Sequence, residues 1–79
     1  MNLTTDIKTN MRGNKQERER IGQRIAEIRR EHGITQLELA ERTGIRREHV
    51  CRIEQGRYSV GFDALQTIAE ALGKRIDFI

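Results

Sequence analysis

Four glycines divide most of this chain into helix-length segments, and this punctuation limits the folds that are open to it. They lie just past segments whose apolar residues recur at helical spacing: Gly33, Gly44, Gly56 and Gly73. Glycine is the preferred residue immediately after a helix, where the backbone turns into the left-handed region. With 79 residues and no proline, the chain has room for one small helical domain and not two. We therefore expect an all-α fold of four helices packed in one compact domain.

Capping patterns predict where the first two helices begin. Asn14 followed by Glu17 resembles a capping box. Thr35 followed by Glu38 repeats the pattern. Between them, isoleucines recur at i, i+4 and i+7 and form one apolar stripe: Ile21, Ile25 and Ile28. The first helix is therefore predicted at about residues 15–32.

The remaining helices are shorter. The second ends at Gly44, which can adopt the positive φ that a tight turn between helices needs. The third is predicted from about Arg46 to Gln55, and the fourth begins at Ser59 or Gly61 and ends at Gly73. The fourth carries one broad apolar face: Phe62, Leu65, Ile68, Ala69 and Leu72.

The last six residues, 74–79, alternate between polar and apolar, which fits a short strand. Their apolar members are Ile76, Phe78 and Ile79. Such an end needs burial, either against the chain's own helices or against a second copy whose twin strand would pair the exposed edge. We divide the chain into a polar arm at 1–13, a helical domain at 14–73 and this tail, for which a dimerisation strand is one option.

Composition narrows the class of protein. Cys51 is the single cysteine, which excludes an internal disulfide and fits a reducing compartment. No apolar run approaches the roughly 18 residues of a membrane span, and the polar start of the chain lacks the apolar segment of a secretory signal. We expect a cytoplasmic protein with no membrane partner. Lys and Arg number 15 against 12 acidic residues, which gives a net charge of +3. Most of the basic residues are arginines, whose guanidinium groups are well suited to binding phosphate and guanine.

The segment 36–53 carries the pattern that decides the function class. Two short helices joined by a turn that contains glycine have the layout of a helix-turn-helix. The pattern Q-x-x-L-A-x-x-x-G-I-x-x-x-x-V-x-x-I is formed by Gln36, Leu39, Ala40, Gly44, Ile45, Val50 and Ile53. It resembles the phage-repressor/Cro-type helix-turn-helix of the XRE family, and the resemblance covers about residues 17–73. It implies a lambda-repressor-like DNA-binding domain.

The third helix has an outward face that suits DNA. An advance of about 100° per residue brings Val50 and Ile53 together on the inward side. Four side chains point the other way, toward base edges if the helix lies in the major groove: Arg47, Glu48, Cys51 and Arg52. Arg47 and Arg52 suit guanine, and Glu48 suits the amino group of cytosine. The resemblance gives these three the family's main base-contacting positions.

Other positions are predicted to contact the DNA backbone or to support the scaffold. The expected phosphate or backbone contacts are Gln36, Arg46, His49 and Arg57. The resemblance implies that Gln36 touches the backbone and sometimes a base, whereas Arg46 and Arg57 are expected to hold phosphates. It also implies an ion pair between Arg29 and Glu54 beneath the third helix, whose loss would cost a few kcal/mol.

No group of residues points to a metal, a cofactor or catalysis. His49 and Cys51 are two positions apart, so they face different sides of a helix and make a poor metal pair. Cys51 is expected to be a plain thiol at the DNA face, and a redox switch in which oxidation blocks docking is the alternative. We therefore expect no metal, no cofactor and no enzymatic activity.

These features predict a sequence-specific DNA-binding transcriptional regulator. We expect a repressor that binds double-stranded DNA as a homodimer, on an inverted repeat with half-sites about 34 Å apart. One alternative is the antitoxin of a toxin–antitoxin pair, which would bind a toxin partner and regulate its own synthesis. Another is an adaptor that uses the same helices to bind proteins. The arginines on the outward face of the third helix favour DNA over the adaptor.

Overall fold

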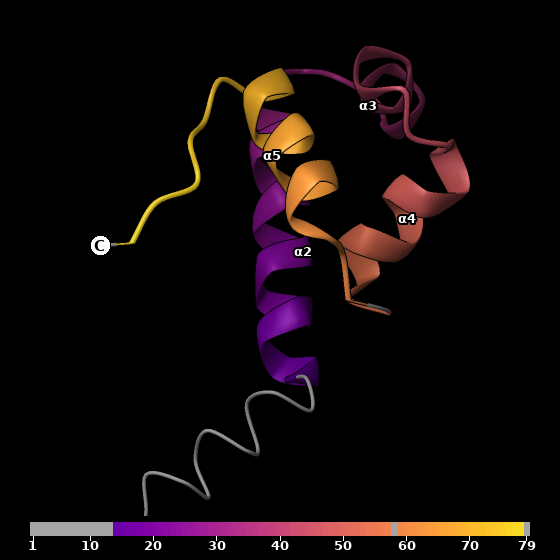
Figure 1. The fold of residues 1–79 in the computed structure, drawn as a ribbon. Coiled ribbons are helices and arrows are strands. Elements are labelled where there is room, and N and C mark those ends of the chain that lie inside the picture. The colour runs from indigo at the N-terminus through magenta and orange to yellow at the C-terminus, as the bar shows by residue number, and fades with distance from the viewer. Residues whose placement is uncertain (1–13, 58, 79) are drawn as a thin grey trace, which may run out of the picture.

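Four helices make up the described part of the chain (Figure 1). The structure, a computed structural model, describes residues 14–57 and 59–78. The helices are α2 (Lys15–Glu31), α3 (Gln36–Thr43), α4 (Arg47–Gln55) and α5 (Phe62–Ala71). The predicted all-α fold is thus confirmed. The arm predicted at 1–13 lies outside the described residues.

Local capping sets the starts of α2 and α3. The Asn14 side chain accepts a hydrogen bond from the Glu17 amide at 3.1 Å, while the Glu17 carboxylate accepts from the Arg20 guanidinium. At α3 both bonds of a capping box form: the Glu38 amide donates to Thr35 Oγ1 at 3.1 Å, and the Thr35 amide donates to Glu38 Oε1 at 2.9 Å. Hydrogen bonding to the Thr35 backbone amide, and secondarily to the Thr35 side chain, lowers the pKa of the Glu38 carboxyl. The carboxylate therefore stays charged at lower pH. It lies in the first turn of α3, where the positive end of the helix dipole stabilises a negative charge.

The helix boundaries differ slightly from those expected. Arg46 is the extended cap before α4, with φ −63° and ψ 145°, so the helix proper begins one residue later. Of the two starts considered for α5, Gly61 is its cap and Ser59 precedes it. Between α3 and α4, Gly44 has φ 75° and its amide donates to the Ala40 carbonyl. The predicted left-handed turn residue therefore joins the two helices of the motif.

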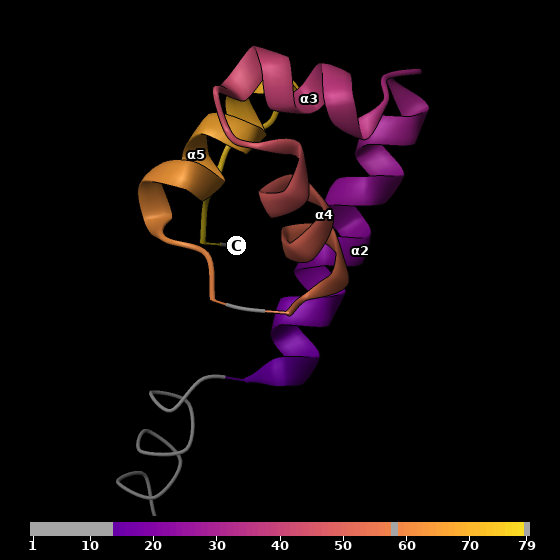
Figure 2. The same cartoon turned by 90° about the vertical axis from the view of Figure 1, so that its right-hand side faces the viewer.

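The core joins all four helices around α4 and α5. Figure 2 shows α4 between α2 and α5, with α3 across one end. Leu39 and Val50 are fully buried, and Ile68 and Leu72 bring α5 against them. The other core members are Ile25, Ile28, Ile34, Ala40 and Ile53. This packing fixes the angle between α3 and α4, and therefore determines which side chains of α4 face outward.

Two glycines let α2 and α4 approach closely. A Cβ on Gly22 would lie 2.4 Å from the Ile53 carbonyl oxygen and 2.5 Å from that of Glu54. Gly56, at φ 70°, would bring a Cβ 2.7 Å from the Glu19 backbone. Both contacts lie at the end of α4. They place its last turn directly against the first half of α2.

The tail behind α5 forms no strand among its described residues, 74–78, so the strand predicted there is wrong for the single chain. A strand is stable only when a neighbouring edge pairs with it, and no described segment offers one. The tail extends away from the helices (Figure 1). Phe78 is fully exposed and Ile76 is 39% exposed, whereas Ile79 lies outside the described residues. Over the described ranges, none of the helices combines the length and apolar character needed to cross a membrane.

Candidate nucleic-acid interface

The outward face of α4 borders a surface groove. Helix α4 buries Val50, Ile53 and Glu54 against its neighbours, which leaves the opposite side of the helix toward solvent. The groove is lined by Gln36, Arg47, Glu48, Cys51, Arg52, Gln55 and Arg57. The structure therefore brings six of the predicted DNA-facing residues to one surface. Gln55 was not predicted, although it lies four residues after Cys51 and so falls on the same side of the helix.

The groove is positively charged. It holds three arginines against one carboxylate, that of Glu48. Within the described part of the chain, Arg47, Arg52 and Arg57 form no ion pair, and the ion pairs found there involve other arginines. Guanidinium groups of this kind suit phosphate oxygens and the O6/N7 edge of guanine. The chemistry of the groove is therefore that of an anion-binding surface with one carboxylate, that of Glu48, set among the arginines.

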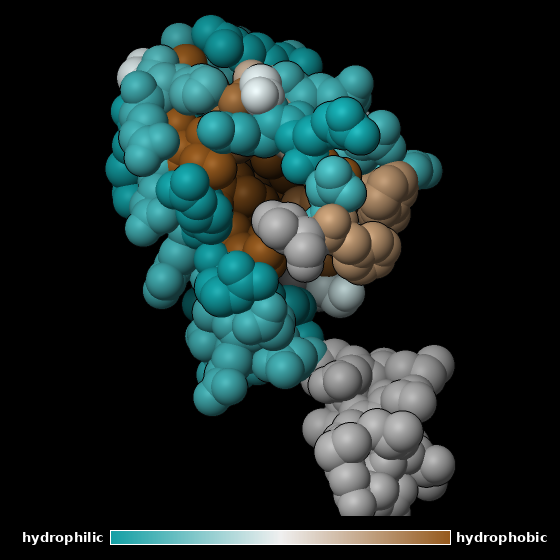
Figure 3. Space-filling view, turned by 90° about the vertical axis from the view of Figure 1, so that its left-hand side faces the viewer, coloured by the Kyte–Doolittle hydropathy of each residue, from teal (hydrophilic) through white to brown (hydrophobic). Residues whose placement is uncertain are grey.

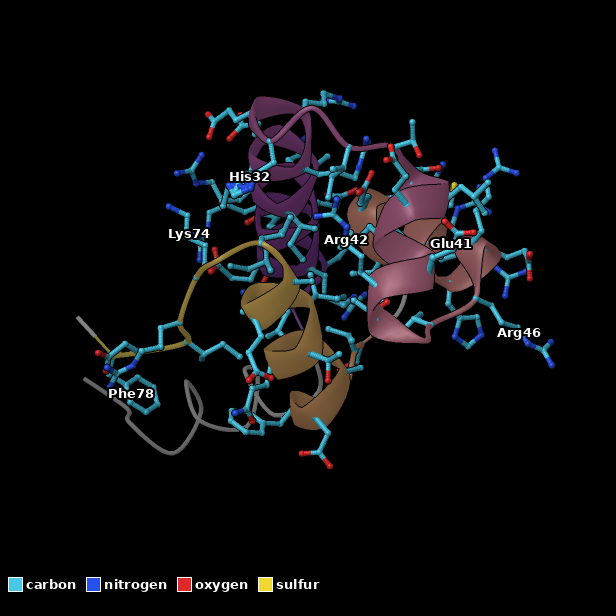
Figure 4. The ribbon with its side chains drawn as sticks, turned by 90° about the horizontal axis from the view of Figure 1, so that it is seen from above. His32, Glu41, Arg42, Arg46, Lys74 and Phe78 are labelled. Carbon is cyan, nitrogen blue, oxygen red and sulfur yellow. The ribbon has the colours of Figure 1, made fainter. Side chains whose placement is uncertain are left out.

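Arg46 and His49 do not line this groove, although both are exposed. Figure 4 shows Arg46 at the turn between α3 and α4, with its side chain pointing away from the helices. This position lies beyond the N-terminal end of α4, whose dipole favours anions. Cys51 is a free, half-buried thiol. The described residues contain no cluster of His, Cys, Asp and Glu side chains arranged to hold a metal.

A buried ion pair joins α2 to the inward side of α4. Arg29 Nε donates to Glu54 Oε2 at 2.7 Å and its Nη2 donates to Oε1 at 3.1 Å. Both residues are 8% exposed. The hydrogen bond to Glu54 raises the pKa of Arg29, against the opposing effect of burial. Arg29 Nη1 also donates to the Ile34 carbonyl at 2.9 Å, so the pair ties α2, the α2–α3 loop and α4 together.

Gln36 joins the ion pair to the surface. Its Nε2 donates to Glu54 Oε1 at 2.9 Å, and the contact is partly buried. Sequence reasoning assigned Gln36 to DNA alone and missed this bond. The two residues are 18 positions apart, and no local pattern reports a contact across that separation. In the structure, Gln36 therefore both lines the groove and contacts the network that supports α4.

Comparison with known proteins agrees with this architecture. A family model described as helix-turn-helix matches residues 25–79. The chain therefore belongs to the helix-turn-helix family, and the resemblance to the phage-repressor type is confirmed. Together with the four helices, this membership defines a lambda-repressor-like fold. No solved structure gives a significant match.

The relatives include regulators from a phage and from archaea. The immunity repressor of Bacillus phage phi105 is 39% identical over 59 residues, which is 75% of this chain and 41% of the repressor. An HTH-type transcriptional regulator of Methanothermobacter thermautotrophicus is 48% identical over 50 residues, 63% of this chain and 72% of the relative. One of Archaeoglobus fulgidus is 39% identical over 54 residues, 68% of this chain and 77% of the relative. This chain therefore matches less than half of the phage repressor. The names denote regulators, in agreement with the expectation of a non-enzymatic protein.

Proposed function

We propose that this protein is a sequence-specific transcriptional repressor that binds an inverted-repeat operator as a homodimer and acts by occlusion. The observation that carries the proposal is the groove along α4, with one carboxylate and three arginines that form no ion pair with any described residue. That face belongs to the second helix of the helix-turn-helix, the element that enters the major groove in such motifs. The phage repressor among the relatives supports repression.

Individual roles follow from the chemistry of each side chain. Arg47 and Arg52 each present a fork of donors that matches guanine, and Glu48 accepts from the amino group of cytosine. Because a carboxylate facing phosphate-rich DNA is unfavourable without a partner, Glu48 contributes to specificity more than to affinity. Arg46 and Arg57 hold phosphates at the two ends of α4. His49 follows Arg46 by three residues and is also exposed. Its role in the proposal is to contact the DNA backbone near Arg46.

Selection of bound duplexes tests the proposal directly. Purified protein is mixed with fragmented host DNA or random duplexes, and the retained fragments are sequenced. An enriched inverted repeat, with half-sites about one helical turn apart, is the expected result. Binding that depends only on salt, with no enriched sequence, would overturn the proposal. That outcome would favour a protein-binding adaptor, or an antitoxin that requires its toxin for DNA binding.

Arg52→Ala is expected to weaken operator binding by about 1–3 kcal/mol and to relax the base preference at one position. Binding to random duplexes should change much less, because a base contact is lost and the phosphate contacts remain. Fluorescence anisotropy on operator and random duplexes measures both. Arg24→Ala removes the same charge from α2, outside the groove, and serves as the control. An equal loss on both duplexes would show that Arg52 contacts phosphate and not a base.

The dimer part of the proposal rests on uncovered apolar surface. Phe78 and Ile76 project from the tail, and Figure 3 shows a hydrophobic hollow on the side of the molecule toward which the tail extends. One apolar hollow between α2, α4 and α5 is lined in part by Ile21, Ile53, Val60 and Leu65. Exchange of tails between two copies would cover both surfaces. We therefore place the dimer contact at the tail, with Ile76, Phe78 and Ile79.

Replacing both Ile76 and Phe78 with serine is expected to convert a dimer to a monomer. The substitutions remove two of the three apolar side chains of the tail and leave the sequence of the helices unchanged. Sedimentation equilibrium of the full chain gives the mass directly. Leu37→Ser is the matched control, since Leu37 is also a large exposed apolar residue, 53% exposed, but lies at the start of α3. An unchanged dimer in the tail variant would refute this interface.

A further inference from the structure

Gln36 occupies an unusual position at the surface. It is the first residue of α3 and is half-buried. It lines the arginine groove along α4, and it also lines two neighbouring hollows, one toward α2 and one toward the α2–α3 loop. The side chain therefore lies where three concave parts of the surface meet, next to Arg47 of the proposed reading face.

Glu54 determines which groups Gln36 has left to offer. A carboxylate without its proton can only accept hydrogen bonds. The Gln36 atom 2.9 Å from Glu54 Oε1 must therefore be the amide nitrogen and not the amide oxygen. Since Glu54 is also held by two hydrogen bonds from Arg29, it is a fixed anchor. One N–H of Gln36 is used there, and one N–H donor and the carbonyl oxygen remain.

We propose that Gln36 reads an adenine in the operator, with Glu54 fixing the amide in the orientation needed. An adenine offers N7 as an acceptor and N6–H as a donor in the major groove, which together match one amide N–H and one amide oxygen. Phosphate offers only acceptors and would pair with the amide N–H alone, whereas adenine pairs with both of the remaining amide groups. The inference rests on the proposed DNA-binding function. It narrows what the family resemblance implies for Gln36, a contact with the DNA backbone and sometimes with a base, to one base, adenine.

A modified base tests the contact. Once the operator is known, each adenine of a half-site is replaced in turn with 7-deazaadenine, which lacks the N7 acceptor. For the intact protein, affinity should fall about tenfold at one position, as expected for loss of part of a base contact. For Gln36→Ala, the same replacement should cause no further loss. Gln66→Ala, on the distant helix α5, should behave like the intact protein.

The outcomes separate this inference from the function on which it rests. If the intact protein enriches an operator but no adenine replacement distinguishes it from Gln36→Ala, the adenine contact is refuted and the repressor proposal stands. If no operator is enriched, both fail. Since Gln36→Ala also removes one partner of Glu54, its thermal unfolding is measured as well. A drop in affinity that is uniform over all positions would mark Gln36 as a support of α4 only, and would refute base reading.

Discussion

Glu54→Ala is expected to lower the free energy of unfolding by about 3–5 kcal/mol, because removing one partner of a buried ion pair leaves the other as an unpaired buried charge. Arg29 is 8% exposed and would keep its charge, because arginine stays protonated in proteins. The amide of Gln36 would lose its partner as well. A domain of this size has a total stability of only about 4–12 kcal/mol. The substitution would therefore remove a large share of the stability of the domain.

Urea unfolding of the full chain, followed by circular dichroism, measures the change. Glu27→Ala is the matched control, because it breaks the exposed pair with Arg24, and exposed pairs contribute about 0.5 kcal/mol or less. A double replacement, Arg29→Met with Glu54→Leu, should recover most of the stability, since apolar residues of similar size often substitute for a buried pair. A loss below 1 kcal/mol for Glu54→Ala would show that the pair is not a structural support.

The helices were predictable because the signals that set them are local. The box formed by Thr35 and Glu38 spans one turn, and Gly44 supplies its own left-handed conformation. The outward face of α4 was also predictable, since the inward positions Val50 and Ile53 fix the rotation of a regular helix. The start of α4 was placed one residue early. Arg46 is the N-cap residue, but its side chain makes no capping hydrogen bond, and arginine is not one of the residue types that mark a helix start.

Apart from the Arg29–Glu54 ion pair, which the family resemblance implied and the structure contains, the contacts that cross between helices were not readable from the sequence. The bond from Gln36 to Glu54 joins two helices whose packing decides it, and neither residue type is unusual for an exposed position. The tail forms no strand in the single chain for a related reason: alternation predicts a strand, but pairing needs an edge that the described residues of one chain do not provide. Gly22 is a third case. In the sequence it is only a residue of low helix propensity within a helix. Its role in the close packing depends on the α4 backbone that faces it.

Gly22→Ala is expected to destabilise the protein by about 3 kcal/mol, although alanine is the better helix former by about 1 kcal/mol. The added Cβ would lie 2.4 Å and 2.5 Å from two carbonyl oxygens in the last turn of α4. Those atoms are backbone and cannot turn aside as a side chain does. Helix α4 would have to move outward, away from the core that sets its angle.

This displacement gives the substitution a second, functional signature. Because Glu54 is one of the residues that Gly22 contacts, a shift of α4 also moves the ion pair and the reading face. Operator affinity, measured at a temperature where both proteins are folded, should therefore fall further than affinity for random duplexes. Gly61→Ala is the control, since nothing lies within 4 Å of its added Cβ, and it should cost no more than about 1 kcal/mol as a change of helix cap. Stability and operator binding as high for Gly22→Ala as for the unaltered chain would mean that α2 and α4 are not in the close contact described.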